Sequence, residues 1–247
     1  MYIEGKNAVI SAIKNQITIN KILVDKNFSS RKDEIISLAR QNKIRIEFLP
    51  RNILDKKSQT SHHQGYIAES VDFEYSSIDD ILNKAKSKNE APFIVILDCL
   101  QDPHNFGAII RSCECAGVHG IIIQKDRQVQ VNETVIKTSA GAVSNMLIAR
   151  VTNLKEAIKK LQDNDVWIYG TDASGENVYN SSCNQSIALI IGSEGDGIRK
   201  TILDKCDKVL SLEMKGTVNS LNASVACGVF LFEILRQRSL KWTMKNL

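Results

Sequence analysis

The chain has 247 residues, 43% of them hydrophobic and 24% charged, which is typical of a globular protein and excludes a disordered or fibrous chain. Its formal net charge of +4 is too small to indicate nucleic-acid binding by itself. The excess lies in residues 1–72, which hold 12 Lys and Arg against 8 Asp and Glu, whereas the rest of the chain is balanced. This asymmetry suggests a module that faces nucleic acid, although a solvated basic face gives the same count.

Other classes are disfavoured by what the sequence lacks. No apolar run reaches the length of a membrane span, and residues 1–6 carry no apolar signal segment. The 6 cysteines form no Cys-x-x-Cys pair, and no histidine stands at zinc-ligand spacing from them. We therefore expect a cytoplasmic protein with reduced thiols, no metal site and no membrane contact.

Residues 1–72 read as a small α/β unit with a polar loop at 58–65. The expected elements are a helix at Gly5–Lys14, a strand at Lys21–Asp25, a helix at Ser30–Gln41 opened by a Ser cap, and strands at Ile44–Leu49 and Tyr66–Val71. Residues 73–92 hold one short helix, Ser77–Lys86, and then a charged stretch, which predicts a connection between two domains.

Residues 93–247 alternate between apolar strands and amphipathic helices. Strands are expected at Phe93–Leu97, Gly120–Ile123, Leu147–Val151, Val166–Gly170, Ile187–Gly192 and Val209–Leu212. Helices are expected at Phe106–Ala116, Leu154–Gln162, Ile198–Lys205 and Ser220–Arg238. Strands that are apolar throughout and alternate with helices predict an α/β domain with a parallel sheet covered on both faces.

The first polar cluster follows the strand at Phe93–Leu97. Asp102 and Asn105 fit the start of a helix after Pro103, and Arg111 lies six residues beyond Asn105 on the helix body. An arginine beside apolar neighbours needs an anionic or carbonyl partner, unless it extends from a half-buried face into water.

The second cluster, Gly192 to Gly197, follows the strand at Ile187–Gly192. Its glycines let the backbone approach a ligand closely, but their spacing is not the dinucleotide fingerprint, and no phosphate-loop lysine follows. A tight turn explains the glycines but not Glu194, which lies between them.

The third cluster lies between the strand at Val209–Leu212 and the last helix. Five hydrogen-bonding side chains fall within eight residues: Thr217, Asn219, Ser220, Asn222 and Ser224. Such residues favour helix caps, yet their density at the end of a strand also suits a ligand pocket. The loop Lys125–Arg127, after the strand at Gly120–Ile123, is either a solvated loop or a contact for phosphates.

In this order and spacing, the three clusters resemble the motifs of the SpoU (TrmH-like) branch of the SPOUT RNA ribose methyltransferases. The matching residues are Asp102 to Ala108 with Arg111, Gly192 to Gly197, and Met214, Gly216 and Ser220 to Ala226. Residues 2–9 and 63–68 resemble the ribosomal-protein-like RNA-binding domain of the two-domain members. Residues 151–154 and 232–238 resemble the bacterial 23S rRNA guanosine 2′-O-methyltransferase subgroup. One departure is Glu213, where the family usually has Pro.

The resemblance implies a fold and a set of site residues. It implies an RNA-binding domain at 1–72, a linker at 73–92 and a SPOUT domain at 93–247 with a deep trefoil knot, working as a homodimer. Carried over to this chain, the catalytic residues are Arg111, Asn105, Glu194, Ser220 and Asn222. S-adenosylmethionine would be held by Gly192, Leu212 and Leu221, with Ile191 and Met214 close by and Gly170 and Thr171 as candidates for its adenosine part.

The substrate implied is a guanosine of 23S rRNA in the peptidyl-transferase region. Alternatives are methylation of tRNA or of a 23S adenosine, an RNA-binding protein of the same fold without catalysis, and an unrelated nucleotide-dependent α/β enzyme. In the family picture Arg111 removes the proton of the ribose hydroxyl. A guanidinium resists deprotonation, so Arg111 could instead bind the adjacent phosphate and stabilise negative charge.

Overall fold

The computed structural model describes residues 2–14, 19–28, 33–58, 60–70, 73–217 and 220–245, with side chains up to residue 239. The chain divides into two compact units, Met1–Glu74 and Tyr75–Leu247. Among the described residues no helix is long and apolar enough to cross a membrane.

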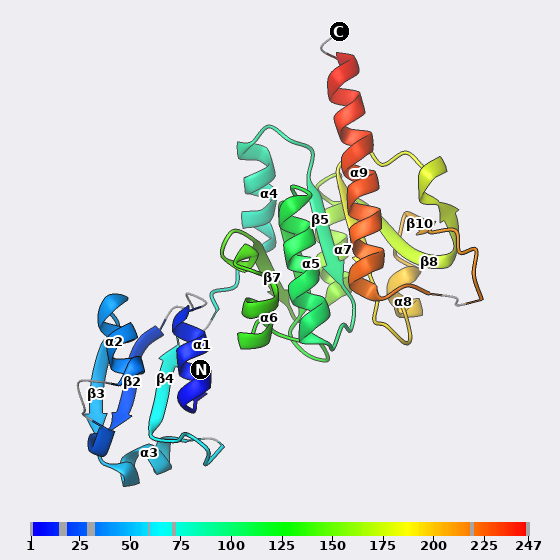
Figure 1. The fold of residues 1–247 in the computed structure, drawn as a ribbon. Coiled ribbons are helices and arrows are strands. Elements are labelled where there is room, and N and C mark those ends of the chain that lie inside the picture. The colour runs from blue at the N-terminus through cyan, green and yellow to red at the C-terminus, as the bar shows by residue number, and fades with distance from the viewer. Residues whose placement is uncertain are drawn as a thin grey trace. The chain divides into compact units, whose positions relative to one another are not determined.

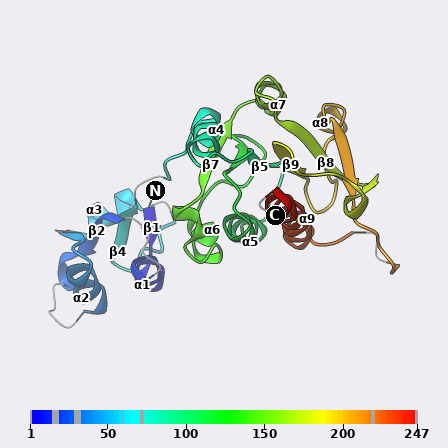
Figure 2. The same cartoon turned by 90° about the horizontal axis from the view of Figure 1, so that it is seen from above.

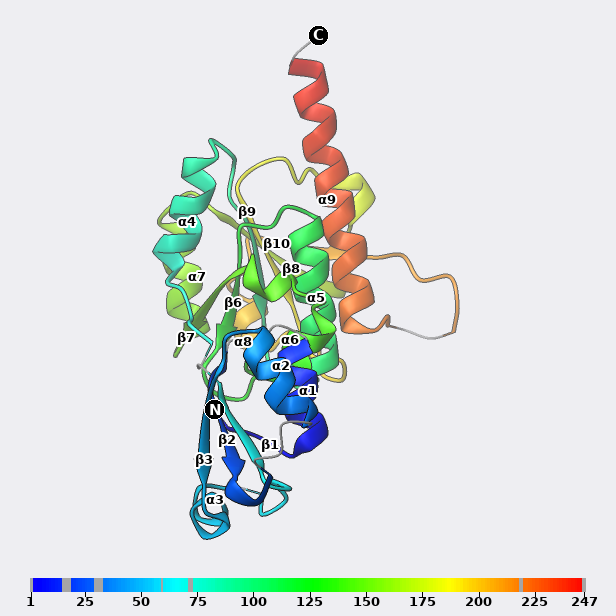
Figure 3. The same ribbon diagram turned by 60° about the vertical axis from the view of Figure 1, so that its left-hand side comes forward.

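The first unit is built on a four-stranded sheet of order β1-β4-β2-β3. Its elements are β1 (Tyr2–Glu4), α1 (Lys6–Lys14), β2 (Ile19–Asp25), a 3₁₀ turn (Lys26–Phe28), α2 (Glu34–Gln41), β3 (Arg45–Leu49), α3 (Arg51–Lys57) and β4 (Tyr66–Ser70). Helices α1 and α2 lie side by side against the sheet, where Val9 and Ile35 join Ile22 in a core (Figure 3). A second small core under α3 joins Leu54 to Leu23 and Ile67.

Helix α2 is shorter than the sequence predicts. It begins at Glu34, and its cap is Asp33, whose carboxylate accepts hydrogen bonds from the backbone nitrogens of Ile35 and Ile36. The predicted Ser cap at Ser30 lies outside the described residues, as does Val71. Two elements were not predicted: β1 has three residues, too few for a periodic pattern, and α3 follows Pro50 directly.

The second unit contains a six-stranded sheet of order β10-β8-β9-β5-β6-β7, in which every pairing is parallel. Its strands are β5 (Phe93–Leu97), β6 (Gly120–Gln124), β7 (Leu147–Val151), β8 (Trp167–Asn177), β9 (Ile187–Ile191) and β10 (Lys208–Ser211). All five residues of β5 and of β9 are buried, as expected for strands covered on both faces. The predicted α/β class with a parallel sheet is confirmed, and all six predicted strands are present.

Helices cover both faces of this sheet (Figures 1 and 2). They are α4 (Ile78–Ser87), α5 (Pro103–Cys115), α6 (Glu133–Thr138), α7 (Leu154–Gln162), α8 (Lys200–Leu203) and α9 (Ala223–Lys245), with 3₁₀ turns at Ala142–Ser144 and Val178–Asn180. Figure 2 shows α4, α7 and α8 on one face and α5, α6 and α9 on the other. Helix α6 was not predicted, since it has only six residues and one buried side chain, Val135.

Residues 73–92 are more than a linker, because their helix packs into the core of the second unit. A reciprocal capping box between Ser77 and Asp80 starts α4, and Ile78 and Ile81 are buried in the core under that helix. The close fit extends to Gly120 of β6, where a Cβ would lie 2.4 Å from Ile81. Residues 75–92 therefore belong to the second unit. The trefoil knot concerns how the chain is threaded, which strand order leaves open, and it stays a prediction.

The six cysteines are all free thiols, consistent with the reduced state expected. Cys113, Cys183 and Cys227 are buried, Cys99 and Cys206 are half-buried, and Cys115 is exposed, so not all belong to the core. Burial raises the pKa of Cys183 to about 11, which keeps this thiol protonated and unreactive at neutral pH.

Two glycines on neighbouring helices give a test of this packing. In α5, a Cβ at Gly107 would lie 1.8 Å from Thr138 Oγ1 and 2.9 Å from the carbonyl oxygen of Val135, so Gly107→Ala should destabilise by about 1–3 kcal/mol. In α9, the nearest atom to a Cβ at Gly228 is Ser112 Oγ at 4.0 Å, so Gly228→Ala should stabilise by up to about 1 kcal/mol. Thermal unfolding should show midpoints shifted in opposite directions; a shift of the same sign in both variants would contradict this packing.

Candidate active site

The three polar clusters come together because the sheet is parallel. The carboxyl ends of its strands share one edge, which is where α/β proteins bind ligands. The first cluster follows β5, the second follows β9, and the third joins β10 to α9. Figure 3 shows residues 212–217, which follow β10, running out from the body of the unit.

Asn105, in the first turn of α5, links the three clusters. Its Nδ2 donates to Glu194 Oε1 at 2.5 Å, and its Oδ1 accepts from Asn222 Nδ2 at 3.0 Å. Asn105 is 8% exposed, so water competes little for these bonds. Its helix is placed by Asp102, which caps α5 by accepting from the backbone nitrogen of His104, and by Pro103 at the first helical position, both as predicted.

Asn222 is held from the other side by the start of α9. Its Oδ1 accepts from the backbone nitrogen and the hydroxyl of Ser224, at 2.9 and 2.6 Å, and from Val225 N at 3.3 Å. The amide is thereby oriented with its Nδ2 toward Asn105. The same side chain thus serves as a helix cap and as a member of the site.

Glu194 lies on a tight loop after β9. The backbones of Ser193 and Gly197 exchange two hydrogen bonds, and Gly197 has a φ of +66°, a conformation that favours glycine. At Gly192 a Cβ would lie 2.1 Å from the carbonyl carbon of Gly197 and 2.3 Å from Ile198 N. No other residue fits at 192 without moving the loop, so Gly192 fixes where Glu194 stands.

A cavity of about 310 Å³ opens beside this loop. It is lined by Thr171–Ala173, Ile191–Gly197, Leu210–Leu212, Met214, Ser220, Leu221, Ala223, Ala226 and Phe230. Three of these residues are acidic, Asp172, Glu194 and Asp196, and none is basic. Hydrogen bonds from Ser174 lower the pKa of Asp172, which is therefore ionised at neutral pH. A cavity with this lining favours a cationic ligand.

A second link joins the end of β5 to the end of the loop at residues 192–197, which we call the glycine loop. The buried carboxylate of Asp98 accepts from Arg199 N at 2.9 Å, from Arg199 Nε at 2.8 Å and from an Arg199 terminal nitrogen at 2.5 Å. The same terminal nitrogen donates to Gln124 Oε1 at 2.8 Å, at the end of β6. The hydrogen bond to Asp98 raises the pKa of Arg199, so this guanidinium remains charged.

The structure brings most of the predicted site residues together around one hydrogen-bond network and one cavity. Asn105, Glu194 and Asn222 are joined by hydrogen bonds, as described above. Gly192, Ile191, Thr171, Leu212, Met214, Ser220 and Leu221 all line the cavity. Asn219, a polar residue of the third cluster, lies outside the described residues. Glu213 is exposed and pairs with Lys215.

Two predicted residues lie elsewhere. Gly170 does not line the cavity; a Cβ at Gly170 would lie 2.9 Å from Cys206 Sγ and 2.9 Å from a methyl carbon of Leu203, which close the space beside it. Arg111 is exposed on α5 and makes no side-chain hydrogen bond or ion pair in the part of the chain that the structure describes. A separation of six residues turns Arg111 away from the helix face that carries Asn105.

Sequence reasoning missed Asp98, Arg199, Asp172 and Asp196. Asp98 and Asp172 gave a signal, since each is a charged residue next to the apolar part of a strand. The partner of Asp98 is 101 residues away, and no pattern indicates that distance. His119 has a structural role: its Nδ1 accepts from Phe93 N at 3.0 Å, and burial lowers its pKa. No cluster that could hold a metal ion is found among the described residues.

Comparison with known proteins identifies the family of this chain. The family model described as "SpoU rRNA Methylase family" matches residues 92–232, and the model "RNA 2'-O ribose methyltransferase substrate binding" matches residues 2–76. The chain belongs to the SpoU rRNA methylase family. The SpoU match contains all three motif clusters, and both compact units are covered by a matched domain.

Relatives of this SpoU protein match over almost their whole length. YacO of Bacillus subtilis, assigned to the TrmH family of tRNA/rRNA methyltransferases, is 42% identical over 240 residues, covering 96% of each chain. The SpoU methyltransferase AviRb of Streptomyces viridochromogenes, crystallised with AdoMet, superposes with a TM-score of 0.70 at 22% identity, covering 96% of this chain and 90% of its own. An AdoMet-bound rRNA methyltransferase of Sinorhizobium meliloti gives a TM-score of 0.62 at 20% identity, covering 95% and 86%. These structures share the fold.

Replacing Asp98 by Asn tests the role of the buried pair. The amide removes the charge that balances Arg199, and breaking a fully buried pair costs about 3–5 kcal/mol. Arg199 is 35% exposed at its side chain, so we expect a smaller loss of unfolding free energy, about 2–3 kcal/mol. Urea unfolding measures it. The control is Glu213→Gln, which breaks the exposed pair with Lys215 and should cost less than about 1 kcal/mol. Equal losses in the two variants would contradict a special role for Asp98.

Proposed function

We propose that this SpoU protein transfers a methyl group from S-adenosylmethionine to the 2′-hydroxyl of a ribose in 23S rRNA. Family membership supports an RNA 2′-O-methyltransferase. The observation that carries the proposal is the hydrogen-bonded chain Glu194–Asn105–Asn222, which lies beside a cavity with an acidic lining.

The cavity fits the cofactor in charge and in size. S-adenosylmethionine carries a sulfonium and an ammonium group against one carboxylate, so Asp172, Glu194 and Asp196 give it a complementary field. A volume of about 310 Å³ is in the range of pockets for small molecules. When bound, the cofactor supplies a methyl group that is already activated by the positive sulfur. AviRb, a SpoU methyltransferase of the same fold, was crystallised with AdoMet.

Backbone groups and apolar side chains would hold the cofactor. Gly192 lets the backbone of the glycine loop come close, and Leu212 and Leu221 bring two further backbone segments to the cavity. Ile191, Met214 and Thr171 complete the lining in this proposal, with Thr171 Oγ1 fixed by its bond to the carbonyl oxygen of Ile190 at 2.9 Å. Gly170 takes no part.

Glu194 is placed to receive the proton of the ribose hydroxyl. One of its carboxylate oxygens, Oε1, is fixed by Asn105, and Oε2 makes no hydrogen bond within the described residues. Oε2 can therefore accept from a hydroxyl while Asn105 keeps the carboxylate in place. Asn222 positions Asn105, and Ser220, which lines the cavity, would contact the sugar.

Arg111 fits the role of charge stabiliser better than that of base. A guanidinium cannot give up its proton at neutral pH, but it can bind a phosphate and an oxygen that gains negative charge. Its exposed position on α5 leaves it apart from the Asn105 network of its own chain. We propose that Arg111 acts in the site of a second copy.

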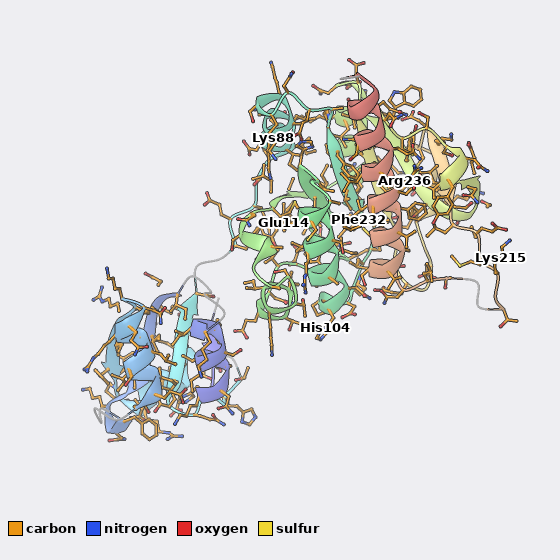
Figure 4. The ribbon with its side chains drawn as sticks, turned by 45° about the horizontal axis from the view of Figure 1, so that its top comes forward. Lys88, His104, Glu114, Lys215, Phe232 and Arg236 are labelled. Carbon is orange, nitrogen blue, oxygen red and sulfur yellow. The ribbon has the colours of Figure 1, made fainter. Side chains whose placement is uncertain are left out.

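The surface beside Arg111 supports a homodimer. On α9, which contacts α5, Val225 and Phe232 are each 51% exposed, and their spacing of seven residues places them on one side of the helix. Figure 4 shows Phe232 on this helix. Large apolar side chains that are exposed in a row mark a surface that is covered in an assembly. Pairing two copies through α5 and α9 would bring Arg111 of each chain toward the other.

The first unit supports RNA as the substrate. Its match to the substrate-binding model covers residues 2–76 and coincides with the basic third of the chain. We propose a guanosine in the peptidyl-transferase region of 23S rRNA. The names of the relatives cover both tRNA and rRNA, so methylation of tRNA or of a 23S adenosine is the alternative that the test must separate.

Cofactor binding and the modified nucleotide can be measured separately. Calorimetry should show S-adenosylmethionine binding to the wild type and at least about tenfold weaker binding to Gly192→Ala, because a Cβ there displaces the loop. Ribose-methylation mapping of RNA from a deletion strain should show one lost 2′-O-methyl in 23S rRNA. Loss of a 2′-O-methyl group in tRNA instead would show that tRNA is the substrate. If the wild type does not bind S-adenosylmethionine, the proposed methyl transfer is contradicted and the protein is an RNA-binding protein without catalysis.

Mixed dimers test whether Arg111 acts across the interface. A dimer of one Arg111→Ala chain and one Asn105→Ala chain, purified through two tags, should keep about half of the wild-type activity, because one site retains both residues. Each homodimeric variant should be nearly inactive. If Arg111 acts within its own chain, the mixed dimer has no intact site and is inactive too. Phe232→Glu should give monomers in light scattering.

A further inference from the structure

The loop between β6 and α6 carries charges that the proposed chemistry does not use. Lys125, Asp126 and Arg127 follow β6 directly and are all exposed. Within the described residues, their side chains make no hydrogen bond or ion pair, so neither cation is neutralised by a neighbour. Arg127 has a φ of +57°, which for a residue other than glycine is an uncommon backbone conformation. Such a conformation persists only where surrounding contacts hold it.

Hydrogen bonds join this loop to the edge of the sheet where the candidate active site lies. Gln101 Nε2 donates to the carbonyl oxygen of Arg127 at 2.7 Å, and Leu100 N donates to Gln128 Oε1 at 2.9 Å. The backbone adds a bond from Val129 N to the carbonyl oxygen of Leu100 at 2.8 Å. Leu100 and Gln101 stand just before Asp102 and Pro103, which start the helix of Asn105. The loop and the first motif are therefore one hydrogen-bonded body.

Inside the loop, a single side chain fixes the turn. Gln130 Nε2 donates to the carbonyl oxygens of Gln124, Lys125 and Gln128 at 3.0 to 3.2 Å. The guanidinium of Arg199 reaches Gln124 as well, so the glycine loop and the β6 end share a partner. Because these hydrogen bonds fix the backbone of the loop, Lys125 and Arg127 extend into solvent from defined positions.

The order of the strands determines which charged groups are neighbours along the carboxyl edge of the sheet. The acidic cavity lies at the ends of β9 and β10 and beside the middle of β8. The Asn105 network lies at the ends of β9 and β5, and the Lys125–Arg127 loop lies at the end of β6. Neighbouring strands are about 4.8 Å apart, so β9 and β6 are separated by about 10 Å. Charge along the edge thus changes from acidic at the cavity, through the neutral amides, to basic at β6.

We propose that Lys125 and Arg127 form a phosphate-binding loop that holds the RNA backbone beside the ribose to be methylated. This inference rests on the proposed function, because it places the substrate strand across the same edge. An RNA strand whose ribose lies at Asn105 and Glu194 has its phosphates within reach of β6, where the cations lie, and away from the acidic cavity. Because phosphate contacts position a strand without reading its sequence, the loop would set the register of the RNA.

The test is a double variant, Lys125→Ala with Arg127→Ala, in the full-length protein. The probe is an in vitro transcript of the peptidyl-transferase region of 23S rRNA, with binding measured at several salt concentrations. We expect RNA affinity to fall about 10-fold to 100-fold. The slope of log affinity against log salt concentration should decrease by the equivalent of about one to two phosphate contacts. The KM for RNA should rise, and calorimetric affinity for S-adenosylmethionine should be unchanged.

Three further variants decide whether the effect is local and due to charge. Lys86→Ala with Lys88→Ala removes two exposed cations at the opposite end of the second unit, where Figure 4 shows Lys88 far from His104 at the start of α5, and should leave RNA affinity nearly unchanged. Asp126→Asn removes the negative charge between the two cations and should strengthen RNA binding. Lys125→Arg with Arg127→Lys keeps both charges and should restore most of the affinity.

The outcomes separate this inference from the proposed function. Wild-type protein that methylates the transcript, together with a double variant of unchanged RNA affinity and KM, would overturn the phosphate-binding loop and leave the methyltransferase assignment standing. An equal loss in the Lys86 and Lys88 control would overturn it too, since the effect would then be one of total charge. A wild type that binds neither cofactor nor RNA would contradict the proposed function itself.

Discussion

The hydrogen bonds that run from Glu194 through Asn105 to Asn222 hold the site together. They join residues that are 89 and 117 positions apart in the chain, and each bond leaves one orientation for the amide that makes it. Because Asn222 is oriented by the backbone of α9, its Nδ2 points toward Asn105. Because Asn105 uses its oxygen for Asn222, its nitrogen remains for the carboxylate. The start of α9 thus orients Asn222, Asn222 orients Asn105, and Asn105 orients the carboxylate of Glu194. The position of that carboxylate also depends on the parallel sheet, whose strands lead into the segments that carry all three residues.

The buried pair of Asp98 and Arg199 complements this chain of bonds. It fixes the far end of the glycine loop to β5, while the Gly192 contact fixes the near end, so that Glu194 is held between two anchors. Arg199 also reaches the end of β6, because its guanidinium donates to both Asp98 and Gln124. One ion pair therefore joins the glycine loop to the ends of two strands. Its carboxylate is fully buried, which makes the pair costly to break.

The sequence predicted the sheet of the second unit well, because runs such as Phe93–Leu97 and Ile187–Ile191 are apolar throughout and long enough to stand out. It predicted Asn105, Glu194 and Asn222 through the three motifs, and their convergence followed from the shared edge of parallel strands. Periodicity could not find β1 or α3, which are short, nor the partner of Asp98, since pairing over 101 residues leaves no local trace. It also could not show which way a strand residue faces: Gly170 and Thr171 are neighbours in β8, yet only Thr171 lines the cavity. Alternation along a strand places them on opposite faces.

The separation of 117 residues between Asn105 and Asn222 has a consequence for how the protein is made. During synthesis the first unit, complete by Glu74, can fold while most of the second is still absent. The contact from Asn105 must wait until α9 has emerged, and bonds that span so many residues form slowly because a long loop must be closed first. The glycine loop and the start of α9 are then joined through Asn105 in a late step. The edge that carries the candidate site is accordingly completed well after the first unit.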